Sequence, residues 1–254
     1  SWMKDVNYSF ALEILYEILK KDDARWNGLK EIINELLYVN EITEYSSFIN
    51  STFHIEDLIS KSINDDPSEK HIHFLVHQII ENYNDFSFKN ESLLDHLTYF
   101  LINNYFEQSW QIFGNYLTNG FNENYKLRMT LEKISFNNEH LFNWANIKPK
   151  LYPSVAINFM NIYKKNDNGS LEWNEHAKKL IDEYGNQPKV LDNIRSQFTN
   201  YSMISSASAS GLYKRRKELV DQLLDHKNEN VKEFAKKLSE YLSSSIEEED
   251  KFGE

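Results

Sequence analysis

The stretch Leu212–Ile246, LYKRRKELVDQLLDHKNENVKEFAKKLSEYLSSSI, decides the fold. Its apolar residues recur at three- and four-residue steps, which places them on one face of a helix. Two such stripes are present: Leu212, Leu219, Val220, Leu223 and Leu224, then Val231, Phe234, Ala235, Leu238, Tyr241 and Leu242. The polar residues 225–230 between them favour a turn, with Asn230 as the N-cap of the second helix. The stretch therefore predicts a helical hairpin, the unit of a helical repeat.

The rest of the chain shows the same helical periodicity. No segment has the sustained alternation of period two that an antiparallel sheet requires, and the polar residues 164–170 predict a loop. Helical pairs follow one another at intervals of roughly 30 to 45 residues, as in solenoid repeats. We therefore expect an all-α protein, a HEAT-like α-solenoid of helical hairpins that forms one domain over residues 1–254. An irregular α-helical bundle is the alternative, and contacts restricted to neighbouring repeats would distinguish the solenoid from it. Gly185 follows one of the stripes and is predicted to be an αL cap.

The amino-acid composition excludes several classes of binding and catalytic site. The 254 residues carry 28 Lys and Arg against 39 Asp and Glu, and the net charge of -11 repels phosphate backbones unless basic residues gather locally. The absence of cysteine excludes disulfides, zinc-thiolate sites and thiol nucleophiles. The sequence shows no apolar run long enough to span a membrane and no export signal, so we expect a cytoplasmic protein. The start Ser1-Trp2-Met3 is unusual and suggests a piece of a longer chain.

Three histidines, His71, His73 and His77, fall in one predicted helix, with Glu81 one turn after His77. The four-residue spacing puts His73, His77 and Glu81 on one side of the helix, so these side chains are candidate metal ligands. That side flanks the apolar stripe and points mostly to solvent. We therefore favour a solvated helix face, and we expect no metal and no cofactor.

A dense basic cluster, Lys214-Arg215-Arg216-Lys217, is a candidate contact for phosphate groups or for an acidic partner surface. We favour the other interpretation, a solvated helix face that balances a strongly acidic chain. Four cations in the first turn of a helix would oppose its dipole. We therefore expect this helix to begin earlier, among residues 205–210.

The remaining features indicate no reaction. Residues 202–211 form a Ser-rich run, for which a plain loop is favoured over a linker, a phosphorylation target or a contact between repeats. The acidic residues 247–254 are expected to fray into solvent. The chain has no phosphate loop, dinucleotide fingerprint, helical His-Glu-x-x-His or Gly-x-Ser-x-Gly elbow, so we expect no catalytic residues. The aromatic residues, including Trp110, Trp144 and Trp173, are expected to fill the core.

Three segments, residues 180–185 (LIDEYG), 190–194 (VLDNI) and 219–235 (LVDQLLDHKNENVKEFA), carry a resemblance to a known group of proteins. The C-terminal part of the chain resembles the HEAT-like α-solenoid tail of large bacterial multidomain proteins, many of them NTPase-type proteins associated with antiphage defence. The resemblance covers residues 105–250, and it is weaker around Leu141, Trp144 and Pro153. It implies an α-solenoid that brings no catalytic residues of its own.

Together these observations indicate a class of function. We expect a non-catalytic helical-repeat module that scaffolds or senses a protein partner, or a neighbouring domain of the same chain, within a larger bacterial protein of antiviral defence. A nucleic-acid-binding or base-processing helical-repeat protein is the alternative, and it requires a basic concave groove. A metal-dependent hydrolase using His73, His77 and Glu81 is the third hypothesis. We expect no membrane contact, and we do not favour nucleic acid as the partner.

Overall fold

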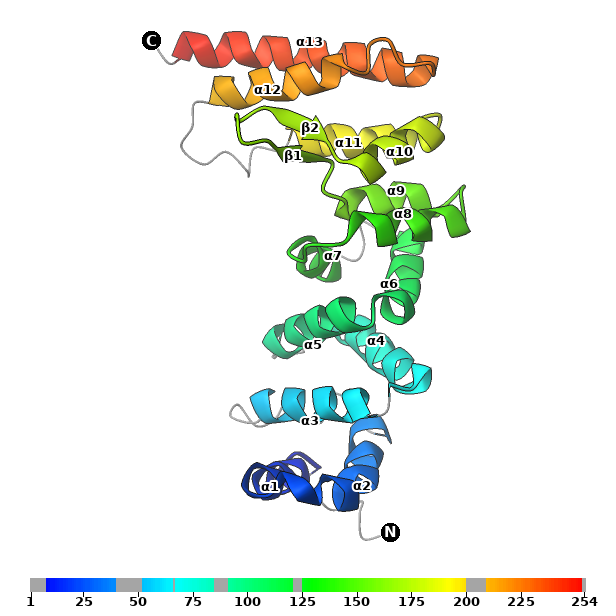
Figure 1. Cartoon of the computed structure of the whole chain (residues 1–254), viewed down its shortest axis with the longest axis vertical. Coiled ribbons are helices and arrows are strands. Elements are labelled where there is room, and N and C mark those ends of the chain that lie inside the picture. The colour runs from blue at the N-terminus through cyan, green and yellow to red at the C-terminus, as the bar shows by residue number, and fades with distance from the viewer. Residues whose placement is uncertain are drawn as a thin grey trace. The chain divides into compact units, whose positions relative to one another are not determined.

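The computed structural model describes residues 8–39, 52–65, 67–84, 91–120, 125–199 and 209–252, and these residues are mostly helical (Figure 1). The all-α class is confirmed, with one short β-hairpin among the described residues as an exception. Contacts divide the chain into two compact units, residues 1–134 and residues 135–254. A single helical-repeat domain over the whole chain stays a prediction.

The N-terminal unit is a succession of helices, with a short 3-10 helix, η2 (Asp23–Arg25), after the first of them. The α-helices are α1 (Tyr8–Lys21), α2 (Trp26–Val39), α3 (Thr52–Asp65), α4 (Glu69–Asn84), α5 (Glu91–Asn104), α6 (Phe106–Gly120) and α7 (Tyr125–Glu132). Helices two places apart in the chain contact each other: α1 with α3, α3 with α5, α5 with α7, α2 with α4, and α4 with α6. The predicted apolar stripes supply the core, because Ile33, Leu75 and Leu97 are fully buried.

A partly buried polar cluster joins three helices of this unit. Tyr83 of α4 donates a hydrogen bond to Asp95 of α5 at 2.7 Å, and Thr130 of α7 donates to the same carboxylate oxygen at 2.6 Å. Burial raises the pKa of the Tyr83 hydroxyl. Burial also acts to raise the pKa of Asp95, but the hydrogen bonds from Thr130 and Tyr83 outweigh it and hold that pKa below its usual value. The ionised carboxylate is therefore the shared acceptor of the cluster.

The described part of the C-terminal unit contains three helical pairs and a β-hairpin. The pairs are α8 (Asn138–Ile147) with α9 (Tyr152–Phe159), α10 (Glu175–Tyr184) with α11 (Pro188–Thr199), and α12 (Ala209–Asp221) with α13 (Glu229–Phe252). The first helices of successive pairs, α8 and α10, contact each other, and so do the second helices, α9 with α11 and α11 with α13. Each pair therefore packs against its neighbour in the chain.

A β-hairpin corrects part of the loop predicted for residues 164–170, because residues 164 and 165 belong to a strand, whereas residues 166–170 form the turn. Strand β1 (Tyr163–Lys165) pairs antiparallel with strand β2 (Leu171–Trp173). Gly169 in the turn has φ 84°, a left-handed conformation that favours glycine. Strands of three residues are too short to show the alternation that identifies a strand in a sequence.

The tryptophans predicted to fill the core are buried. They are Trp110 of α6, Trp144 of α8 and Trp173 of β2. The Trp173 indole donates a hydrogen bond to the carbonyl oxygen of Leu219 in α12 at 3.0 Å, which attaches the hairpin to that helix. The Trp144 ring stacks on Tyr152 of α9, with ring centroids 3.9 Å apart. Aromatic side chains thus join elements of the C-terminal unit.

Two predictions about helix ends are wrong. Asn228 is the cap of α13 instead of Asn230, because its side chain accepts the backbone N–H of Asn230 at 3.0 Å. Gly185, which follows α10, has φ -66° and so is not in the left-handed conformation of an αL cap. Its use is close packing, since a Cβ there would lie 2.4 Å from Cγ2 of Val231 in α13.

The ends of the last helical pair, α12 and α13, also differ in part from the predictions. Helix α12 begins at Ala209, within the predicted range, so residues 209–211 of the Ser-rich run are helical, and residues 202–208 lie outside the described residues. Helix α13 includes the acidic residues 247–250 and ends at Phe252, and the fraying expected for residues 247–254 stays a prediction. Two residues of the predicted apolar stripes, Leu224 and Tyr241, are not buried, because 40% and 42% of their surfaces are exposed.

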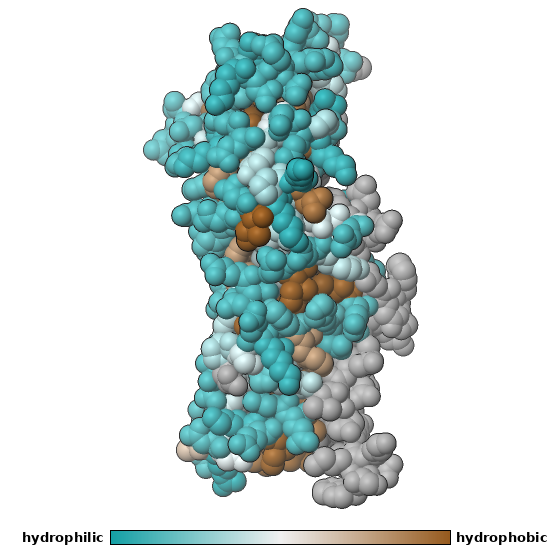
Figure 2. Space-filling view, turned by 90° about the vertical axis from the view of Figure 1, so that its right-hand side faces the viewer, coloured by the Kyte–Doolittle hydropathy of each residue, from teal (hydrophilic) through white to brown (hydrophobic). Residues whose placement is uncertain are grey.

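None of the helices in the described part of the chain could cross a lipid bilayer. No such helix is both long enough and apolar enough. Figure 2 shows a face that is mainly hydrophilic, on which hydrophobic residues form separate patches. The described residues of this face therefore form no single large apolar surface.

Candidate functional site

The candidate metal ligands on α4 have other partners or none. His73 pairs with Glu69 at 3.4 Å, and Glu81 accepts a hydrogen bond from Gln78 at 3.0 Å. His77 is exposed. Throughout the described ranges, no three or more His, Asp or Glu side chains are grouped so that they could hold a metal ion. The spacing of His73, His77 and Glu81 thus places them on one helix without assembling a site.

The basic cluster on α12 does not form one surface. Lys214 is exposed and pairs with Asp250 at 3.1 Å, and Lys217 pairs with Asp221 one turn away at 2.6 Å. Arg215 is half-buried. Arg216 is 1% exposed, so for this residue both the candidate partner contact and the favoured solvated helix face are wrong. The four cations therefore point in different directions around the helix, and two of them are neutralised by acidic neighbours.

An Asp–His pair lies near the turn between α12 and α13. His226 and Asp182 of α10 approach to 2.8 Å through Nε2 of the histidine, and Nδ1 accepts the backbone N–H of Asn228 at 3.1 Å. Since Nδ1 accepts a hydrogen, the proton of the neutral ring is on Nε2 and is donated to Asp182. Both ring nitrogens are engaged, so the pair holds the turn in place and leaves no nitrogen to act as a base.

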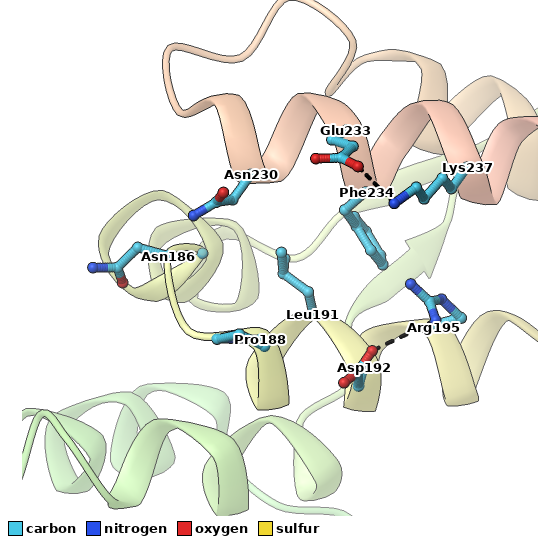
Figure 3. A pocket seen from close by; sticks show the side chains of 10 residues that line it. Asn186, Pro188, Leu191, Asp192, Arg195, Asn230, Glu233, Phe234 and Lys237 are labelled. Atoms are coloured by element: carbon cyan, nitrogen blue, oxygen red, sulfur yellow. Dashed lines mark hydrogen bonds and ion pairs between the residues drawn. The ribbon is translucent and has the colours of Figure 1, made fainter.

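A groove lies between α11 and α13, and we refer to it as the α11–α13 groove (Figure 3). Side chains of residues 185–195 form one wall and side chains of residues 230–237 form the other. Its volume is about 330 Å³. Both walls belong to the C-terminal unit, and the two helices that carry them contact each other directly.

Two apolar side chains form the floor of the groove, and the rest of its lining is mostly polar. Leu191 of α11 and Phe234 of α13 line it, and they are 7% and 3% exposed. Phe234 belongs to the predicted stripe of residues 231–242, and Leu191 lies on the buried face of α11, which explains why both lie at the contact between α11 and α13. The apolar centre of the groove is therefore buried, and little of its surface is open to solvent.

Charged side chains form the rim. On α11, Arg195 pairs with Asp192 at 3.5 Å, and on α13, Lys237 pairs with Glu233 at 2.6 Å. The hydrogen bond from Lys237 lowers the pKa of Glu233. The guanidinium carbon of Arg195 lies 6.0 Å from the ring centroid of Phe234, a cation–π contact that bridges the two walls.

The charges are ordered along the groove. Figure 3 shows α11 and α13 running in the same direction, from Pro188 to Arg195 on one wall and from Asn230 to Lys237 on the other. In each helix the acidic residue precedes the basic one, as Asp192 precedes Arg195. Both carboxylates thus lie beside Leu191 and Phe234 in the middle of the groove, and both cations lie beyond them toward one end.

Sequence reasoning missed this groove, although a signal for its rim was present. An acidic residue followed by a basic residue three or four positions later recurs on α11 and α13, and such pairs usually support a single helix. Nothing in the sequence shows that these two helices are neighbours. Comparison of the chain with protein-family models, with curated proteins and with solved structures gives no match.

Proposed function

We propose that this chain is a non-catalytic helical-repeat interaction module that scaffolds or senses a protein partner, and that the α11–α13 groove contacts this partner. The observation that carries the proposal is a groove with an apolar centre, Leu191 and Phe234, and a rim of exposed opposite charges. Protein interfaces combine an apolar core with a polar rim in this way. A groove of this size suits a few side chains of a partner.

The order of the helical contacts supports a solenoid of the HEAT type. Helices two places apart pack on each other in both units, as α9 packs on α11 and α2 packs on α4. Stacked hairpins of this kind present side chains that vary without disturbing the core. That the module belongs to a larger bacterial antiphage-defence protein is part of the proposal and rests on the resemblance of residues 105–250.

The charges of the groove favour a protein partner over the alternative, a nucleic acid. Binding of a phosphate backbone needs clustered cations that are free of acidic neighbours. In the α11–α13 groove Arg195 and Lys237 are each paired with a carboxylate, and on α12 Arg216 is buried. A groove with equal numbers of both charges suits a polypeptide with mixed side chains.

Site-specific photo-crosslinking tests the proposal. A photoreactive amino acid at Asn186, which lines the groove, should give a discrete covalent adduct with a protein in a lysate of the native host. The same amino acid at Asp167, an exposed residue in the hairpin turn, is the matched control. Equal labelling from both positions, or no adduct from Asn186, would count against the groove as a contact surface.

A further inference from the structure

We infer that Asn168, in the turn of the β-hairpin, is a site of spontaneous covalent modification at which the side-chain amide is converted to a carboxylate. The reacting groups are Cγ of Asn168 and the backbone nitrogen of Gly169. The chain contains three Asn-Gly dipeptides, which begin at Asn27, Asn119 and Asn168. In the described part of the chain, Asn168 is the one of these three whose side-chain oxygen accepts hydrogen bonds.

The reaction is an addition within the chain followed by hydrolysis. The Gly169 nitrogen forms a bond to Cγ of Asn168, the Cγ–Nδ2 bond breaks, and Nδ2 leaves as ammonia with the proton that Gly169 loses. Water, the only co-reactant, then opens the resulting five-membered imide at either of its two carbonyl carbons. Opening at one carbon gives aspartate. Opening at the other gives isoaspartate, in which the main chain passes through the former side chain.

Ser170 stabilises the charge that develops during the addition. Its backbone N–H donates to Oδ1 of Asn168 at 2.9 Å, and its hydroxyl donates to the same oxygen at 2.7 Å. Negative charge builds up on Oδ1 as the nitrogen adds to Cγ, so donors already directed at that oxygen lower the barrier. Asn166 orients the hydroxyl, because its Nδ2 donates to Oγ of Ser170 at 3.3 Å.

The turn also leaves the reacting groups accessible. Oδ1 of Asn168 accepts the N–H of the second residue after it, so the side-chain amide spans Gly169. Gly169 has no side chain to shield its nitrogen, and its φ of 84° favours glycine. Asn168 is exposed, so water can reach the imide and ammonia can leave.

One hydrogen bond of the turn opposes the reaction. The N–H of Gly169 donates to the carbonyl oxygen of Asn166 at 2.9 Å, and this bond has to open before the nitrogen loses its proton. The paired strands have three residues each, and a two-stranded hairpin is only marginally stable by itself. The hydrogen bonds between Asn168 and Ser170 are local, so they can persist while the bond to Asn166 opens.

The other two Asn-Gly dipeptides lie in helices. Asn27 and Gly28 belong to α2, and Asn119 and Gly120 are the last two residues of α6. A helix fixes the backbone torsions of both residues, and the imide cannot form unless the chain leaves these torsions. The folded protein should therefore direct the modification to Asn168.

The modification should loosen the hairpin from α12. Isoaspartate adds a methylene group to the main chain of a turn that is closed by Asn166, whose N–H donates to the carbonyl oxygen of Ser170 at 2.9 Å. The hairpin is attached to α12 through the indole of Trp173, which donates to the carbonyl oxygen of Leu219 at 3.0 Å. The age of the molecule is thereby coupled to the packing of α12.

Ageing the full chain at mildly alkaline pH, followed by peptide mapping with mass spectrometry, tests the inference. In the folded chain Asn168 should convert, and methylation by an isoaspartyl methyltransferase should identify the isoaspartate. Asn27 and Asn119 should remain amides in the folded chain, whereas in urea all three should convert at similar rates. Conversion of Asn27 or Asn119 as fast as Asn168 in the folded chain would overturn the inference, and so would an unmodified Asn168.

Two variants at Ser170 test the role of its hydroxyl. In the folded chain, Ser170→Ala should slow the conversion of Asn168 about fivefold, the factor that one hydrogen bond of about 1 kcal/mol supplies. Ser170→Thr keeps the hydroxyl and should convert at nearly the parent rate. In urea the three proteins should react alike, because the donor is no longer held in place. Equal rates for the folded alanine and threonine variants would refute this role.

Hydrogen exchange across residues 163–173 tests the consequence for the hairpin. Aged protein should exchange faster than fresh protein in this segment. Asn168→Asp carries the new charge without the additional methylene group, so it should exchange like the fresh parent protein. Unchanged exchange in protein that contains isoaspartate would show that the modification does not loosen the hairpin.

Discussion

Arg216 of α12 donates a hydrogen bond from Nη1 to the carbonyl oxygen of Phe198 at 2.6 Å, in the last turn of α11. Its Nη2 lies 3.4 Å from the hydroxyl of Tyr163 in β1. No carboxylate in the described ranges pairs with this buried cation. The carbonyl groups at the C-terminus of α11 carry a negative partial charge, which stabilises the guanidinium. Arg216 therefore connects α11, α12 and the hairpin.

We expect Arg216→Ala to lower the free energy of unfolding by about 2–4 kcal/mol, because it leaves a cavity and an unpaired Phe198 carbonyl. Arg215→Ala removes the half-buried neighbour and should change the free energy by less than about 0.5 kcal/mol. Urea titrations measure both values, and hydrogen exchange across residues 188–199 shows whether α11 is loosened. Equal urea midpoints for the two variants would contradict the structural role of Arg216.

The burial of Arg216 had a signal in the sequence. Arg216 precedes Val220 by four residues and Leu223 by seven, so it lies on the buried stripe of α12. A cluster of four cations suggests a surface, but the phase of the helix separates its members. The same helical periodicity of apolar residues was sufficient to predict the helical pair α12 and α13.

The α11–α13 groove could not be predicted in the same way. Periodicity places Leu191 and Phe234 on the inner faces of their helices, but it does not show that these faces meet. The contact between α11 and α13 depends on how α12 and the β-hairpin position α13. The β-hairpin itself was not predicted, because its strands are short. Helices could thus be predicted from the sequence, whereas contacts between elements distant along the chain could not.

Thr130 is expected to be essential to the polar cluster of the N-terminal unit. Thr130→Val keeps the shape of the side chain but removes the hydroxyl that donates to Asp95 at 2.6 Å. The carboxylate then loses a hydrogen bond in a partly buried position, and the free energy of unfolding should fall by about 1–2 kcal/mol. Thr130→Ser retains the hydroxyl and should lose less. Thermal unfolding curves in which the valine and serine variants coincide would argue against this hydrogen bond.

Asp182 is expected to make stability depend on pH in the acid range. Burial acts to raise its pKa, but the hydrogen bonds from Lys178 and His226 outweigh it, so the folded pKa lies below the unfolded value. Such a carboxyl stabilises the fold above its unfolded pKa of about 3.9, and this contribution is lost as the pH falls through the folded value. Asp182→Asn should therefore flatten the loss of stability below about pH 4.

Urea titrations at several pH values measure this slope. Asp167→Asn, in the exposed hairpin turn, is the control and should leave the pH dependence of the parent protein unchanged. If Asp182→Asn and Asp167→Asn give the same slope, the ionised form of Asp182 is not what holds the turn around His226.

Two glycines should respond to the same substitution with opposite signs. A Cβ added at Gly28 in α2 would meet no atom within 4 Å, so Gly28→Ala should raise the free energy of unfolding by roughly 0.5–1 kcal/mol. A Cβ at Gly185 would lie 2.4 Å from Cγ2 of Val231 and 2.5 Å from the carbonyl oxygen of Ile181. Gly185→Ala must therefore shift the end of α10, α13 or both, which should cost about 1–3 kcal/mol.

The displacement should also reach the α11–α13 groove, because Gly185 lines it and Val231 lies in the same helix as Phe234. Gly185→Ala should reduce the yield of the photo-crosslinked adduct from Asn186, whereas Gly28→Ala, in the other unit, should leave that yield unchanged. Urea midpoints and crosslinking yields of the two variants test this directly. A Gly185→Ala protein as stable as the parent, with an unchanged yield of adduct, would mean that α13 does not depend on close contact at Gly185 for its position.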